Sequence, residues 1–127
     1  MKRDDMLKVA SVLLVLLFTL HLTDDVIHGF EKAGPSILMA LPISLVFLCA
    51  GLLLAGRRSG YFIMFLGSLL AVGVPYLHMK GKSIGRIAEG SGGFFFIWTL
   101  LAMGVIASFA VVLSLMGLWS SWRRPRP

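Results

Sequence analysis

One segment concentrates the side chains that could do chemistry: residues 21–28, with the sequence HLTDDVIH. Its imidazoles and carboxylates, His21, Asp24, Asp25 and His28, are spaced at i, i+3, i+4 and i+7. An α-helix advances about 100° per residue, so these four side chains share an arc of roughly 100° and form one polar stripe. Imidazole nitrogens and carboxylate oxygens together suit a divalent transition metal, namely Zn, Fe, Mn or Cu(II).

His78 is a fifth candidate ligand, because it ends an apolar stretch that should run through the membrane in the same direction as the first one. Its imidazole would then lie at the same membrane level as the stripe. We therefore expect a metal site at the outer end of a helix bundle, and we identify no catalytic residue. The predicted ligands are His21, Asp24, Asp25, His28 and His78.

The same residues allow two other interpretations. Histidine titrates near physiological pH, so a stripe of imidazoles and carboxylates could relay protons. Alternatively, the groups could be merely interfacial, with Asp24 and Asp25 paired to cations at that end of the protein. The candidate cations for such ion pairs are Lys32, Lys80, Lys82 and Arg86.

The elements that must position these side chains are membrane helices. Apolar residues make up 57% of the 127 positions, charged residues only 14%, and the mean hydropathy is +0.89. A water-soluble domain of this size needs more polar surface. The charged clusters divide the chain into stretches near the roughly 20 residues that cross a bilayer. We predict an all-α, integral membrane four-helix bundle in a single domain, 1–127, with spans at about 5–28, 36–55, 61–78 and 94–119 and an outer loop at 79–93.

The net charge of +6 sets the orientation and does not indicate nucleic-acid binding, since the basic residues lie in short loops beside the spans. Eight of the twelve Lys and Arg fall on the side of the two termini: Lys2, Arg3, Lys8, Arg57, Arg58, Arg123, Arg124 and Arg126. By the positive-inside rule both termini are cytoplasmic. We expect a multi-pass protein of the plasma membrane of a prokaryote.

Prolines and small residues indicate how the spans pack. Pro42 and Pro75 each remove a helical hydrogen bond in the outer third of a span, and kinks at matched depth would open an outward-facing cavity. Small residues four apart, such as Gly67 and Ala71, allow helices to approach closely.

Three functions are compatible with these patterns. The first is metal binding or proton relay at the polar stripe, in transport or as part of a membrane complex. The second is a non-catalytic accessory subunit that packs against a larger membrane enzyme or transporter through its small-residue surfaces. The third is a metal-dependent hydrolase of lipid headgroups, which we favour least because only Glu31 or Glu89 is available as a separate general base. The partners expected are the lipid bilayer and either a larger membrane-protein complex or further copies of the chain in a homo-oligomer.

Overall fold

The computed structural model describes residues 1–29, 34–80 and 92–123, and every regular element within these ranges is an α-helix. The all-α prediction is therefore confirmed for the described residues. The bounds are α1, Arg3–Ile27; α2, Pro35–Leu38; α3, Ala40–Leu52; α4, Arg58–Lys80; and α6, Gly93–Arg123.

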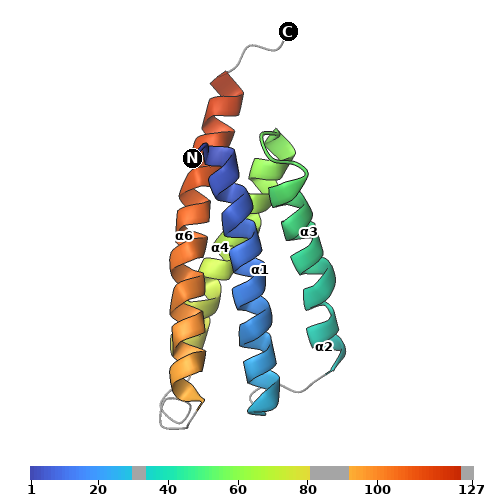
Figure 1. Cartoon of the computed structure of the whole chain (residues 1–127), viewed down its shortest axis with the longest axis vertical. Helices are drawn as coiled ribbons and strands as arrows, with labels where there is room; N and C mark the ends of the chain where they lie inside the picture. Colours follow the sequence, from blue (N-terminus) through green and yellow to red (C-terminus); the bar gives the residue numbers. More distant parts are fainter. Residues whose placement is uncertain (30–33, 81–91, 124–127) are drawn as a thin grey trace.

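The long helices alternate in direction along the chain. In Figure 1, α1 and α4 run from the end that carries the N-terminus toward the opposite end, and α3 and α6 return. The first and last residues of the bundle therefore lie at the same end. The last turns of α1 and α4 and the first turn of α6 meet at the other end, where the polar stripe of the sequence is located.

Three of the described helices are long and apolar enough to cross a membrane: Arg3–Ile27, Arg58–His78 and Gly93–Arg123. These spans confirm a multi-pass integral membrane protein. Apolar side chains such as Val105 and Leu70, which are 71% and 72% exposed, cover the outer faces of these helices. Exposure of that kind is the normal state of side chains that face lipid.

The segment predicted as the second span is interrupted. Apolar α3 has 13 residues and is about 20 Å long, less than the roughly 30 Å of a hydrocarbon core. It is separated from α2 at Met39, close to Pro42, whose ring nitrogen cannot donate to the carbonyl of Leu38. A fourth membrane crossing over 36–55 therefore stays a prediction.

The other predicted segments differ from the helices at their ends. Helix α4 begins before residue 61 and continues to Lys80 without a break at Pro75, while α6 extends beyond residue 119 to Arg123. Of the predicted loop 79–93, residues 81–91 lie outside the described part of the chain, as do residues 30–33 and 124–127.

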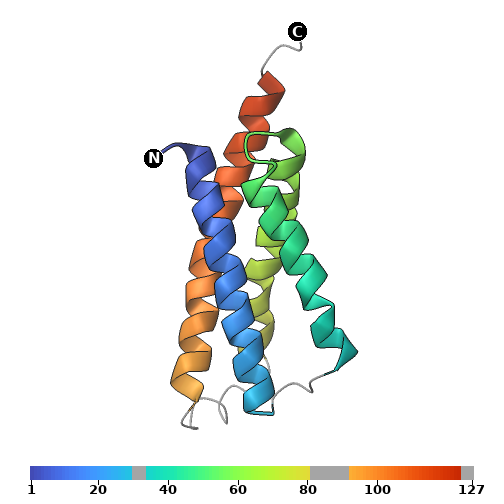
Figure 2. The same cartoon turned by 45° about the vertical axis from the view of Figure 1, so that its right-hand side comes forward.

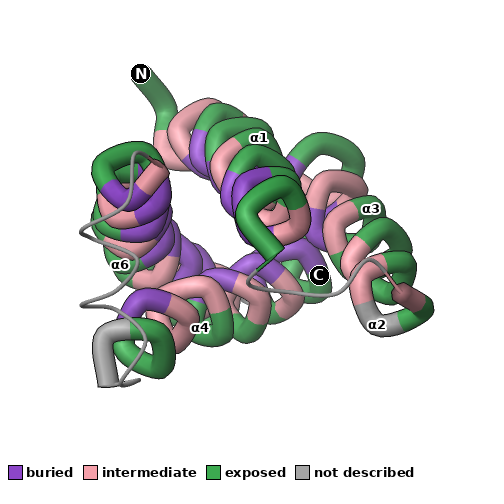
Figure 3. Tube along the Cα trace, turned by 90° about the horizontal axis from the view of Figure 1, so that it is seen from below, coloured by how far each residue is buried: buried purple, intermediate pink, exposed green. Residues whose placement is uncertain are grey.

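The core lies between α1, α4 and α6. Viewed along the bundle, the buried parts of these helices face one another, and their outer faces are exposed (Figure 3). Met64, Leu100 and Met103 are the larger apolar side chains at its centre, each 1% exposed, and Ala107 and Ala110 let α6 approach closely. These three helices therefore supply most of the core.

Helix α3 completes this core on another side, where its Phe47 and Ala50 are buried. It packs against α1 and α4, and the end that carries α2 diverges from α1 (Figure 2). Phe47 anchors α3 by covering Gly67 of α4, where a Cβ atom would lie only 2.3 Å from the Phe47 ring. A glycine is required at position 67 because any side chain there would push α3 away.

A polar clamp closes the end of the bundle near the termini. The Tyr61 hydroxyl accepts a hydrogen bond from Nη2 of Arg3 at 2.7 Å and donates one to Oδ1 of Asp4 at 2.6 Å. Nη1 of Arg3 also donates to Oγ of Ser120 at 2.9 Å. The clamp joins the starts of α1 and α4 to the last turns of α6 and so fixes the register of the long helices.

Candidate metal centre

The polar stripe occupies the last two turns of α1, just before the helix ends. Gly29 follows with a φ of +71°, a left-handed conformation that stops the helix. His21 is 1% exposed, and Asp24 and Asp25 are also buried. These three side chains of the stripe therefore face the bundle interior rather than lipid, whereas His28 is exposed. Two carboxylates exposed to lipid at this depth would be costly.

His21, Asp25 and His78 converge in space. One ligand atom from each residue lies within 4.8 Å of the other two. Nε2 of His21 is 3.8 Å from Oδ2 of Asp25, and the rings of His21 and His78 meet edge to face with centroids 5.3 Å apart. Two helices, α1 and α4, thus supply a set of two imidazoles and one carboxylate.

The hydrogen bond of His21 to α6 determines which ring nitrogen is available. Oγ1 of Thr99 lies 3.4 Å from Nδ1 of His21 and 3.0 Å from the carbonyl oxygens of Phe95 and Phe96. The carbonyls take the only hydroxyl proton, so Thr99 accepts the Nδ1 proton of His21. Nε2 then carries the lone pair, and among the described residues it has no hydrogen-bond partner.

His78 is oriented in the same way. Its Nδ1 donates to the carbonyl oxygen of Val74 at 2.9 Å, and a carbonyl can only accept. Neutral His78 therefore also presents an unprotonated Nε2. A metal-binding histidine usually donates its other ring N–H to an oxygen acceptor, which fixes the tautomer and the orientation of the ring.

Phe96 closes the site from the bundle interior. Its ring lies 4.7 Å from the His21 ring and 5.9 Å from the His78 ring, measured between centroids, and it is 1% exposed. His78 itself is exposed. The group is therefore closed on the α6 side and accessible on the side of His78.

Asp24 and His28 form a separate pair on the same helix. Nδ1 of His28 lies 3.1 Å from Oδ1 of Asp24 and 3.0 Å from the Asp24 carbonyl oxygen. The His28 ring covers Gly92, where a Cβ atom would be only 2.4 Å from Nε2. The five residues of the sequence prediction thus divide into a group of three and a pair.

The interfacial interpretation pairs the carboxylates with cations that lie mostly outside the described residues. Three of the cations that it pairs with Asp24 and Asp25, namely Lys32, Lys82 and Arg86, lie outside the described residues. The same holds for Glu31 and Glu89, the proposed general bases of a hydrolase.

Sequence reasoning missed Thr99 and Phe96 in the first turns of α6 and Gly92 directly before it. A threonine in an apolar helix usually bonds to its own backbone, which Thr99 also does, so its type carries no signal. The depth of Thr99 in the membrane was the available signal. Thr99 lies about one and a half turns after the start of α6, and His21 lies about the same distance before the end of α1, so the two residues are at the same depth.

The His21–Asp25 pair is spaced near the value of a metal site, whereas the ligand atoms of the whole group spread over up to 4.8 Å and would have to move closer to share one ion. Ligand atoms at about 2.0–2.1 Å from a tetrahedral zinc ion lie roughly 3.4 Å from one another. The 3.8 Å between His21 and Asp25 differs from this value by less than half an ångström. Three protein ligands leave a fourth position for water or another molecule, as in catalytic rather than structural zinc sites.

Comparison with known proteins gave no match to a family model, to a curated protein or to a solved structure. The function must therefore be argued from the geometry of the site itself.

Proposed function

We propose that this chain is a membrane protein that binds one divalent transition-metal ion at His21, Asp25 and His78. One observation carries the proposal: ligand atoms from two helices come within 4.8 Å of one another, with His21 and Asp25 buried and His78 exposed. A buried Nε2 without a hydrogen-bond partner among the described residues is costly unless something else occupies its lone pair. A metal ion would do so.

The types of ligand atom narrow the choice of metal ion. Two imidazole nitrogens and one carboxylate oxygen suit Zn, Fe, Mn or Cu(II), whereas Cu(I) prefers thiolate and thioether sulfur. The open fourth position favours an ion that exchanges or binds a further ligand, in transport or within a membrane complex, over one that only holds the fold together.

The topology proposed with this function has four membrane crossings, with α2 and α3 together forming the second, and both termini in the cytoplasm of a prokaryotic cell. The excess of Lys and Arg near the termini supports it. The metal centre would then face the outside of the cell, where His78 is accessible.

Elemental analysis of the purified protein tests the proposal. After loading and gel filtration, the wild type should retain about one metal ion per chain, and the double variant His21→Ala, His78→Ala should retain none. A wild type that holds no ion after exposure to all four metals would refute it.

His28→Ala is the matched control, since it removes an imidazole from the same helix but outside the three-residue group. We expect it to keep its metal. Loss of the ion in this variant would show that the Asp24–His28 pair belongs to the coordination sphere, as the five-residue prediction has it.

Proton relay is a second candidate, favoured by the Asp24–His28 pair at 3.1 Å next to a second imidazole–carboxylate contact. Metal-free protein in liposomes with an internal pH dye tests it. If His28→Ala still binds metal but no longer conducts protons, the result would favour proton relay over metal binding as the main role.

A further inference from the structure

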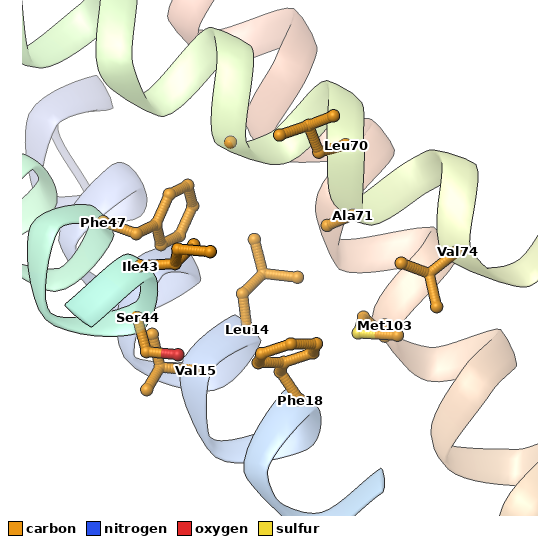
Figure 4. A pocket seen from close by; sticks show the side chains of 11 residues that line it. Leu14, Val15, Phe18, Ile43, Ser44, Phe47, Leu70, Ala71, Val74 and Met103 are labelled. Carbon is orange, nitrogen blue, oxygen red and sulfur yellow. The ribbon is translucent and has the colours of Figure 1, made fainter. Parts of the chain in front are cut away.

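A cavity of about 170 Å³ lies between α1, α3 and α4 (Figure 4). Its wall is apolar apart from the Ser44 hydroxyl. Leu14, Val15 and Phe18 of α1 line one side, Phe47 of α3 another, and Val74 of α4 and Met103 of α6 the rest. An apolar cavity of about 150 Å³ already stays dry and takes up benzene, so this one is large enough for a short run of hydrocarbon.

The cavity lies one helical turn from the metal centre, toward the middle of the membrane. Phe18 precedes His21 by three residues, Val74 precedes His78 by four, and Met103 follows Thr99 by four. At 1.5 Å per residue these steps correspond to about 4.5–6 Å along each helix. Residues three or four apart share a helix face, so all three helices place the cavity directly beneath the centre.

A polar centre above an apolar cavity fits a molecule with two ends. We propose that the site binds a membrane amphiphile whose anionic oxygen headgroup takes the open coordination position and whose hydrocarbon chain enters the cavity. This inference rests on the proposed metal site and names the class of ligand that it takes.

Lipid is the occupant that the surroundings favour. Ile43 of α3 and Leu70 of α4 line the cavity and are themselves 61% and 72% exposed, so the cavity wall is continuous with the apolar outer surface. A chain from the bilayer therefore reaches the cavity without crossing water. A divalent ion held by two neutral imidazoles and one carboxylate would keep a net positive charge, which would attract an anionic headgroup at that depth.

Alkyl hydroxamates provide the test, because the hydroxamate group binds a metal through oxygen and the chain length can be varied. Protein loaded with Co(II), whose visible spectrum reports coordination, is titrated in detergent with acetohydroxamic and octanohydroxamic acid. Each buried CH₂ raises affinity about fourfold at most. We expect the long chain to bind at least about tenfold more tightly, since detergent competes for part of the gain.

Val15→Phe and Val12→Phe form the matched pair of variants. Val15 lines the cavity, whereas Val12, one turn away on α1, is 45% exposed and does not. Micelles concentrate the long hydroxamate equally around both. Val15→Phe should lose the chain-length preference and keep its affinity for acetohydroxamic acid, and Val12→Phe should behave as the wild type.

Equal chain-length preference in the two variants would overturn the amphiphile proposal while leaving metal binding intact. Failure to load Co(II) would instead overturn the metal site itself, and elemental analysis distinguishes the two results. If Val15→Phe does not fold, Ala71→Leu fills the same cavity from α4 and must give the same loss.

Discussion

His21 and Thr99 contact each other across the interface of α1 and α6, with Nδ1 of the imidazole 3.4 Å from Oγ1 of the hydroxyl. This contact fixes both the orientation and the tautomer of a ring that is almost completely buried. The first prediction follows from it, because the threonine acts on the metal only through the histidine.

Thr99→Val should weaken metal binding by about 10- to 100-fold, the usual effect of removing the hydrogen-bond partner of a metal-binding histidine. Thr99→Ser keeps the hydroxyl and should restore most of the affinity. Thr19→Val is the control, since Thr19 makes the same kind of bond to a backbone carbonyl but is exposed. Competition with a chelator of known affinity provides the measurement, and equal affinities in all variants would contradict the role assigned to Thr99.

The neighbouring carboxylates Asp24 and Asp25 should respond differently to the same substitution. Asp25→Asn removes a charged ligand, so we expect a loss of at least about 100-fold in metal affinity, larger than the loss from removing a residue that only hydrogen-bonds to a ligand. Asp24→Asn disturbs the pair with His28 and should change affinity less than tenfold. Isothermal titration of both variants decides the matter. A larger loss in Asp24→Asn would reverse the assignment.

Two glycines of α4 should respond in opposite ways to alanine. A Cβ at Gly67 meets the Phe47 ring, so Gly67→Ala should destabilise the protein by about 1–3 kcal/mol through overpacking. At Gly73 nothing lies within 4 Å, and Gly73→Ala should stabilise by up to about 1 kcal/mol through helix propensity. Thermal unfolding in detergent measures both, and a neutral Gly67→Ala would mean that α3 is not seated as described.

The clamp at the opposite end should contribute to stability and not to metal binding. Tyr61→Phe leaves partly buried groups of Arg3 and Asp4 without their hydroxyl partner and should cost about 1–3 kcal/mol. In a double-mutant cycle with Asp4→Asn, the two changes should be non-additive. Metal content should remain that of the wild type. Loss of metal without loss of stability would contradict this separation of the two ends.

The proposed orientation is tested with single cysteines in a Cys49→Ala background. Ile27 and Arg57 are exposed at opposite ends of the bundle. A membrane-impermeant maleimide should label Ile27→Cys in intact cells and Arg57→Cys only after lysis. The reverse pattern would put the metal centre inside the cell.

Sequence reasoning was sufficient for the helical class because lipid imposes it: a polar backbone in hydrocarbon must satisfy its own hydrogen bonds. The stripe could be predicted because His21 and Asp25 lie on one helix, whose period is fixed. His78 could be placed only by its membrane level, since the distance between two helices depends on packing that a single sequence does not encode.

The division of the stripe into two groups was beyond prediction for the same reason. Side chains 100° apart on α1 meet different neighbours: Asp25 meets His21 and His78, whereas Asp24 meets His28. The interruption at Met39 and the cavity also depend on tertiary contacts, above all on how Phe47 seats α3 against Gly67.

Val74 contributes to both the metal centre and the apolar cavity. Its carbonyl oxygen holds His78 and its side chain forms part of the cavity wall, while the next residue, Pro75, restricts how its backbone can turn. A shift of this one residue would move a ligand nitrogen and reshape the apolar space in the same step. A molecule that binds in the cavity and displaces Val74 would therefore also shift His78, with no further residue needed to link the two.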